Sequence, residues 1–158
     1  MANIMASPSR YVQGAGELKN LCGHVKLLGK KLFVLTSPSG KSRVEADLAA
    51  SAAEQGAALV YEAFRGECSM TEIERVKAAF EASGCDVVVG IGGGKTMDTA
   101  KAVADNYNTA VIIVPTTAST DAPAMGLSVI YTAAGEHVGA RHYKKNPDLV
   151  LLDTDILA

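Results

Sequence analysis

Short apolar runs alternate along the chain with stretches in which apolar residues recur every three or four positions. The runs predict buried strands over residues 32–36, 57–62, 86–91 and 109–114. The helical spacing between them predicts helices over residues 41–55, 70–83 and 96–105. Ser69 and Glu72 fit a capping box before the second helix, and Gly84 fits its stop.

Strands that alternate with amphipathic helices are typical of βαβ units, and these units build parallel sheets. The predicted strands are almost continuous in Val, Ile and Leu, which indicates burial on both faces. The crossovers are expected to be right-handed. The sequence therefore predicts an α/β fold, a Rossmann-like doubly wound parallel sheet with four or more strands.

The pattern changes after Pro115. Residues 115–126 are polar and rich in hydroxyl groups, which predicts a loop. Residues 128–132 and 138–143 flank the turn at 133–136 and predict a β-hairpin insertion.

The last part of the chain predicts another buried strand over residues 148–152. Residues 153–158 resemble the start of a helix. A helix that begins and is immediately cut suggests an engineered fragment, a split subunit or a natural fragment. Residues 1–158 together form a single expected domain, because their number suits one ordinary core.

Composition excludes some classes of partner. The formal net charge is −2, so neither nucleic acid nor an anionic membrane is an expected partner. The three cysteines form no CxxC pair, which favours reduced thiols over a disulfide framework. The chain has no apolar run of membrane-spanning length and no signal-peptide pattern at its start. We therefore expect a cytoplasmic protein.

The glycine-rich segment at residues 90–101, GIGGGKTMDTAK, lies between a predicted strand and a predicted helix. Glycines let the backbone approach a ligand, and a helix N-terminus with Lys95 beside it suits a phosphate group. The segment is not the common GxGxxG turn, because Lys95 and Met97 stand where glycine is needed. It is not a P-loop either, because Val89 stands at the first glycine position. Asp98 is either a helix-favouring acid or a carboxylate that faces the crevice.

This segment resembles the diphosphate-binding turn of the iron-containing alcohol dehydrogenase superfamily. Residues 115–131, PTTASTDAPAMGLSVIY, are similar to the glycerol dehydrogenase branch of that superfamily. SPSRYVQGAG from Ser7, GECSMTEIERVK from Gly66 and NPDLVLLDT from Asn146 are also similar to that branch. The resemblance covers essentially the whole chain in order.

The resemblance implies an NAD-binding domain that is followed, in the family, by a helical domain. That second domain carries a metal, usually zinc in glycerol dehydrogenases, on an aspartate and two histidines. It is absent from these residues, so no metal ligand and no catalytic residue is expected in this chain. The implied activity is oxidation of glycerol to dihydroxyacetone by hydride transfer to NAD, and the chain alone is expected to bind NAD without being active.

The resemblance also implies roles for particular residues. Asp121 matches a carboxylate that binds a glycerol hydroxyl. The residues implied at the cofactor are Ser37, Gly92, Gly93, Gly94, Lys95, Asp98, Thr116, Thr117, Ser119, Met125, Leu127 and Tyr131. Each also has a structural interpretation: Thr116 and Ser119 could close a tight turn, and Tyr131 could pack on a strand.

The chain departs from the branch at two positions. Ser37 stands where an aspartate is common, and serine does not repel a 2′-phosphate, so the choice between NAD and NADP stays open. Met125 stands where a serine is common and can pack against the cofactor without offering it a hydroxyl. His137 and His142 are expected to be exposed hairpin residues rather than metal ligands.

Alternative functions stay open. Another metal-dependent alcohol dehydrogenase of the superfamily, a lyase similar to dehydroquinate synthase, or a nucleotide-binding module without catalytic activity would share this fold. The ASTDAP segment at residues 118–123 argues against the lyase. The expected partners are NAD and a small polyol. Association into a homo-oligomer, or with a metal-binding C-terminal half, is also expected, because the missing half should leave an exposed apolar face.

Overall fold

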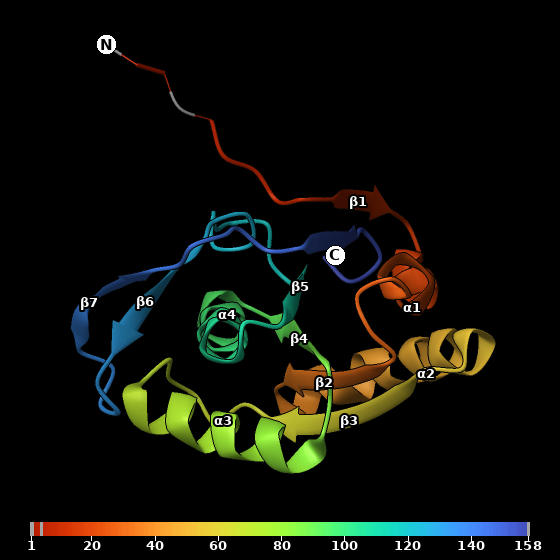
Figure 1. Ribbon diagram of the computed structural model, residues 1–158, viewed down its shortest axis with the longest axis horizontal. Coiled ribbons are helices and arrows are strands. Elements are labelled where there is room, and N and C mark those ends of the chain that lie inside the picture. Colours follow the sequence, from red (N-terminus) through yellow and green to blue (C-terminus); the bar gives the residue numbers. More distant parts are fainter. Residues whose placement is uncertain (1, 4, 158) are drawn as a thin grey trace.

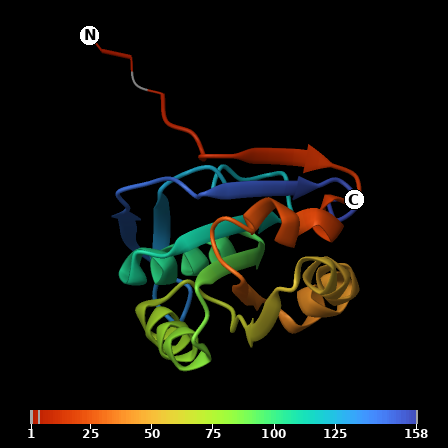
Figure 2. The same cartoon turned by 45° about the vertical axis from the view of Figure 1, so that its right-hand side comes forward.

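The computed structural model describes residues 2–3 and 5–157. Six strands form one sheet in which every pair of neighbours is parallel (Figures 1 and 2). In spatial order they are β1 (Tyr11–Gly14), β8 (Leu149–Asp153), β5 (Ala110–Pro115), β4 (Val87–Gly92), β2 (Lys31–Thr36) and β3 (Ala58–Ala63). The predicted parallel sheet is confirmed, and the predicted strands agree with the observed ones to within one residue at each end.

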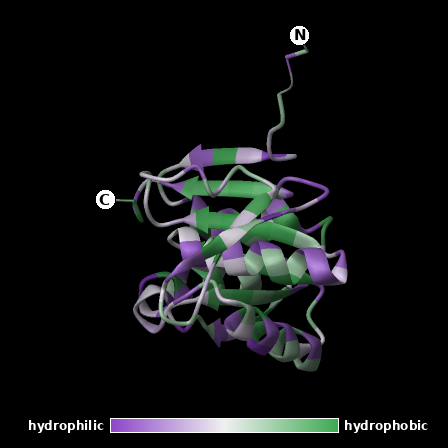
Figure 3. Ribbon diagram, turned by 90° about the vertical axis from the view of Figure 1, so that its left-hand side faces the viewer, coloured by the Kyte–Doolittle hydropathy of each residue, from purple (hydrophilic) through white to green (hydrophobic). Residues whose placement is uncertain are grey.

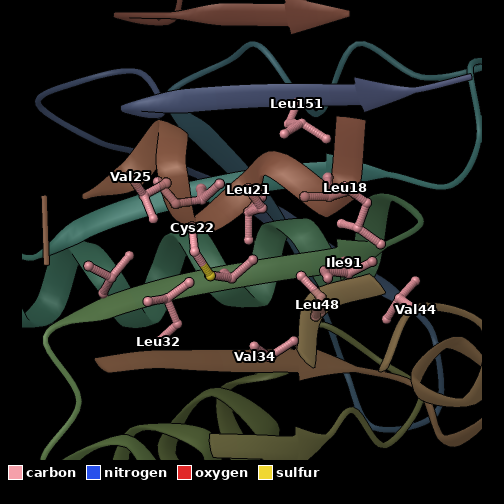
Figure 4. Close-up of a cluster of buried hydrophobic side chains, with 14 of the residues drawn as sticks. Leu18, Leu21, Cys22, Val25, Leu32, Val34, Val44, Leu48, Ile91 and Leu151 are labelled. Carbon is pink, nitrogen blue, oxygen red and sulfur yellow. The ribbon is translucent and has the colours of Figure 1, made fainter. Parts of the chain in front are cut away.

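Helices cover both faces of the sheet. Helix α2 (Pro38–Gln55), the 3₁₀ turn η1 (Glu17–Asn20) and α1 (Leu21–Val25) pack on one face, and α3 (Met70–Ser83) and α4 (Gly94–Tyr107) pack on the other. Successive strand residues point to opposite faces, so Val34 and Val89 join the first core cluster whereas Phe33 and Val88 join the second. Figure 4 shows the first cluster, and Figure 3 shows that hydrophobic residues predominate in the strands between the helices.

A second, two-stranded sheet consists of the antiparallel pair β6 (Leu127–Tyr131) and β7 (His137–His142). The predicted hairpin is therefore confirmed. It lies beside α4, to the left in Figure 1.

Two helices begin earlier than the sequence pattern predicts. Helix α2 was predicted from residue 41, but Ser37 is its N-cap and Pro38 is its first helical residue. Proline suits this position because its missing N–H would have no helical partner. Likewise α4 begins at Gly94 rather than Thr96, because the glycines form its first turn.

The prediction of a helix over residues 153–158 is wrong for the part that the structure describes; Ala158 lies outside the described residues. Residues 154–156 form a turn in which the Ile156 N–H donates to the Asp153 carbonyl. The Asp153 carboxylate accepts hydrogen bonds from the N–H groups of Gly16 and Leu18, at 3.0 and 2.8 Å. Asp153 therefore supports the start of η1 instead of a terminal helix.

The amino-terminal elements β1, η1 and α1 were not predicted. Strand β1 is a short edge strand, and exposed and half-buried residues alternate along it. Its apolar content is too small to stand out in the sequence, whereas its pairing with β8 depends on residues far along the chain.

The chain turns in opposite directions from the middle of the sheet. From β2 it proceeds outward to β3, and from β4 it proceeds the other way to β5. The loops after β2 and β4 therefore diverge, and ligands of open α/β sheets bind in the crevice that such a divergence leaves. Among the described residues, no helix has both the length and the apolar character needed to cross a membrane.

Strand β4 and helix α4 approach each other closely at Gly90. A Cβ at this position would lie 2.6 Å from the Ala100 Cβ, which is closer than packed atoms tolerate. Gly90→Ala is expected to lower the free energy of unfolding by about 1–3 kcal/mol, measured by urea denaturation.

Gly139→Ala is the matched control, because a Cβ there would meet nothing within 4 Å. This control is expected to change the stability by no more than about 0.5 kcal/mol. Equal effects of the two substitutions would contradict the close packing of α4 on β4.

Candidate functional site at the switch point

The amino end of α4 differs from the amino ends of α2 and α3. Ser37 and Ser69 cap those two helices through their hydroxyl oxygens. The N-cap of α4 is Gly93, and no side chain among the described residues caps this helix. The first N–H groups of a helix have no partner inside it and carry a partial positive charge. The turn after β4 therefore presents donors suited to an anion.

Two clefts meet at this helix end. The first has a volume of about 540 Å³ and is lined by Ser37, Gly93, Gly94 and Lys95 among others. The second has a volume of about 290 Å³, and Gly94 and Lys95 line it too. The remaining lining residues of the second cleft are Asp98, Thr120, Asp121, Ala122, Met125, Leu127, Val129 and Tyr131. A ligand that fills both clefts must cross the amino end of α4.

Lys95 lies where the two clefts join, and its side chain is about half exposed. Its Nζ is 2.6 Å from Glu67 Oε1 and 5.3 Å from the centre of the Tyr131 ring. Glu67 lies in the loop between β3 and α3 and was not among the predicted site residues. The adjacent Cys68 is fully buried, and burial raises the pKa of its thiol to about 11, so it is protonated near neutral pH.

Asp98 combines the two interpretations that the sequence left open. It lines the second cleft, yet its side chain is only 8% exposed and is bound on both oxygens. Oδ1 lies 2.8 Å from Lys101 Nζ, and Oδ2 accepts a 2.8 Å hydrogen bond from the Val129 N–H. The Asp98 carboxylate therefore holds the hairpin against α4.

The buried side chain of Lys101 binds the segment that forms one wall of the second cleft. Its ammonium group donates hydrogen bonds to the carbonyl oxygens of Ala122 and Met125, at 2.9 and 3.2 Å, and to that of Leu127. Its side chain is 2% exposed, so the charge is buried and depends on Asp98 and these carbonyls. Lys101 was not among the residues predicted from the sequence, although its i,i+3 spacing from Asp98 is typical of a helical ion pair.

Some of the polar groups in the hydroxyl-rich loop at residues 115–126 are hydrogen-bonded within the loop or to the preceding glycine turn. Thr117 Oγ1 and Ser119 Oγ lie 3.0 Å apart, and the Thr116 N–H donates to the Gly92 carbonyl at 3.0 Å. These four predicted residues border neither of the two clefts. The other predicted cofactor residues, and Asp121, line at least one of them.

The histidines of the hairpin are exposed, and the His137 ring packs edge-on against Tyr131. In the described part of the chain, no three His, Cys, Asp or Glu side chains gather in a group that could hold a metal ion.

A doubly wound parallel sheet with its clefts at the switch point defines a Rossmann-like domain. Residues 8–154 match the family model for iron-containing alcohol dehydrogenases, and the chain belongs to this family of oxidoreductases. Glycerol dehydrogenase of Thermotoga maritima is 46% identical over 151 residues, which are 96% of this chain and 41% of that protein. Glycolaldehyde reductase of Halobacterium salinarum is 39% identical over 158 residues, which are 100% of this chain and 43% of that protein.

Comparison with the solved structure of a relative supports the same family. The crystal structure of a probable glycerol dehydrogenase from Sinorhizobium meliloti matches this one with a TM-score of 0.90 at 37% identity. The match covers 99% of this chain and 42% of that one. The chain thus spans less than half the length of the relatives that it matches.

Lys101→Met is expected to destabilise the chain by about 3–5 kcal/mol, because it leaves the Asp98 carboxylate buried without its cation. Urea denaturation measures the loss. Hydrogen exchange should show the largest loss of protection at Val129, whose N–H donates to Asp98. Combining Lys101→Met with Asp98→Asn is expected to restore part of the stability.

Lys19→Met is the control for removal of a lysine from an exposed pair, since Lys19 and Asp47 lie 4.0 Å apart at the surface. We expect a change within about 0.5 kcal/mol there. A loss at Lys101 no larger than at Lys19 would contradict the buried role of Lys101.

Proposed function

We propose that the chain is the nucleotide-binding part of an NAD-dependent polyol dehydrogenase that converts glycerol to dihydroxyacetone. The observation that carries the proposal is the pair of clefts joined at the uncapped end of α4, with Lys95 at the junction. A dinucleotide has the matching layout, because a diphosphate links its two nucleosides. The family membership and the glycerol dehydrogenases among the relatives support the choice of reaction.

Each half of the proposed dinucleotide is assigned to one of the two clefts. The adenosine half would occupy the first cleft beside Ser37, and the nicotinamide half would occupy the second, against Met125, Leu127 and Tyr131. The diphosphate would lie on the N–H groups of α4 and beside Lys95. Gly93 leaves room for it, because a Cβ there would meet nothing within 4 Å.

The polyol would share the second cleft. Asp121 is exposed on its wall, and we propose that this carboxylate accepts a hydrogen bond from a substrate hydroxyl. Thr116, Thr117 and Ser119 would contact the cofactor only through a rearrangement of their loop. A metal bound by a further domain would supply the Lewis acid that lowers the pKa of the reacting hydroxyl.

Since the resemblance assigns the metal ligands to a further domain, we expect these residues to bind nucleotide without oxidising glycerol. Hydride transfer needs the alcohol held against the nicotinamide, and association with a metal-binding portion would provide that geometry. The three free thiols suit a reducing compartment such as the cytoplasm.

Lys95→Met tests the cofactor site. Calorimetric titration with NAD is expected to show binding to the wild-type chain and roughly tenfold or greater weakening in the variant, because a charged partner of the diphosphate is lost. Lys19→Met, which removes an exposed lysine that lines neither cleft, is the matched control. Absence of NAD binding to the wild-type chain would refute the proposed function.

Ser37→Asp tests the choice of nucleotide. The wild-type chain is expected to bind NADP as well as NAD, because the residue after β2 carries no charge that would repel a 2′-phosphate. The aspartate should weaken NADP binding by roughly tenfold or more through charge repulsion and leave NAD binding nearly unchanged.

Aspartate also caps helices well, so α2 should keep its N-cap. Ser37→Asn is the control, since it has nearly the same shape as aspartate without the charge. If the asparagine variant loses NADP binding as strongly as the aspartate variant, charge does not determine the choice.

A further inference from the structure

Lys95, the cation at the junction of the clefts, already has an anionic partner. Glu67 Oε1 lies 2.6 Å from Lys95 Nζ, and Lys95 also lies over the Tyr131 ring. This is the one ion pair of Lys95 within the part of the chain that the structure describes. Any anion that binds at the end of α4 must therefore share Lys95 with Glu67 or displace it.

The loop around Glu67 is held in place by the hairpin. The Tyr131 N–H donates a hydrogen bond to the Cys68 carbonyl at 2.9 Å, and Ser69 and Tyr131 form an isolated parallel β-bridge. The hairpin turn lies against the carboxylate itself, because a Cβ on Gly135 would be 3.5 Å from Glu67 Oε1. The hairpin turn therefore borders the Glu67 carboxylate on the side of Gly135.

The carboxylate is also poorly solvated. Its side chain is 25% exposed, and Oε2 is buried with no hydrogen-bond donor within reach among the described residues. Separating Lys95 from Glu67 leaves a negative charge that has lost its cation and has little access to water, which is costly.

We propose that Glu67 is a specificity-determining residue that acts as the internal counter-ion of Lys95. A singly charged anion exchanges one negative partner of Lys95 for another and gains little. A doubly charged diphosphate adds a second charge on the N–H groups of α4, so it outcompetes the carboxylate. Glu67 thus lowers the affinity of the site for every anion by the free energy needed to displace it, and an anion with a single charge is left with little net affinity. This inference rests on the proposed function, because it assigns the diphosphate to the end of α4.

Glu67→Gln tests the inference, because it removes the charge and keeps the size of the side chain. Calorimetric titration of the chain with inorganic diphosphate and with NAD is expected to show roughly fivefold to twentyfold tighter binding in the variant. In a Lys95→Met background the same substitution is expected to have less than half that effect on the logarithm of the affinity, because the pair no longer exists.

Glu74→Gln is the matched control, since Glu74 is an exposed residue of α3 that pairs with Lys77. It is expected to leave both affinities unchanged. Thermal unfolding of every variant checks that the fold is retained.

The outcomes separate the two proposals. Unchanged or weaker binding in Glu67→Gln overturns the counter-ion role, and the proposed function stands if NAD still binds to the wild-type chain. Tighter binding of inorganic diphosphate without any binding of NAD supports the counter-ion role and refutes the proposed function. Failure of every variant to bind either ligand overturns both.

Discussion

Burial of both faces of the parallel sheet is the constraint on which the rest of the structure depends. The central strands β2, β4 and β5 are almost wholly buried, so their backbone polar groups pair within the sheet and their side chains are apolar. Polar side chains that could bind a ligand therefore lie at the ends of the strands. The divergence between β2 and β4 opens one of those ends, and both clefts lie there.

One wall of this site is not part of the sheet. The hairpin and the segment before it are attached to α4 through Asp98 and Lys101, which bind carbonyl and N–H groups from Ala122 to Val129. The helix whose uncapped amino end lies between the two clefts also positions the surface opposite. Buried charges within a few residues of the glycine turn therefore hold the loop residues Ala122 and Met125 in the wall of the second cleft.

Much of the fold could be predicted from the sequence, because continuous apolar strands and helical spacing are local patterns. The predicted hairpin and the helix stop at Gly84 are also confirmed. Elements whose partners are distant could not be predicted: β1 pairs with β8, which lies more than a hundred residues further along the chain, and Asp153 supports η1 instead of a helix of its own. The capping box is half formed, since Ser69 accepts from the Glu72 N–H while the Glu72 carboxylate binds the Arg65 N–H and Arg75. For the candidate site, the glycine-rich segment and the family resemblance predicted Gly94 and Lys95, which line both clefts, whereas Glu67 and Lys101 are evident only from their contacts.

The pairing of the first strand with the last has a consequence for how the chain folds during synthesis. Residues of η1 and α1 pack in a cluster that includes Leu149 and Leu151, and among the strands that the structure describes β1 is paired with β8 alone. While the ribosome extends the chain, β2 to β5 can assemble as soon as they emerge, but the amino-terminal segment must wait until residue 153 is available. The residues of η1 and α1 are thus made before β2 to β5 but reach their native contacts after them, and during that interval their leucines are exposed to chaperones.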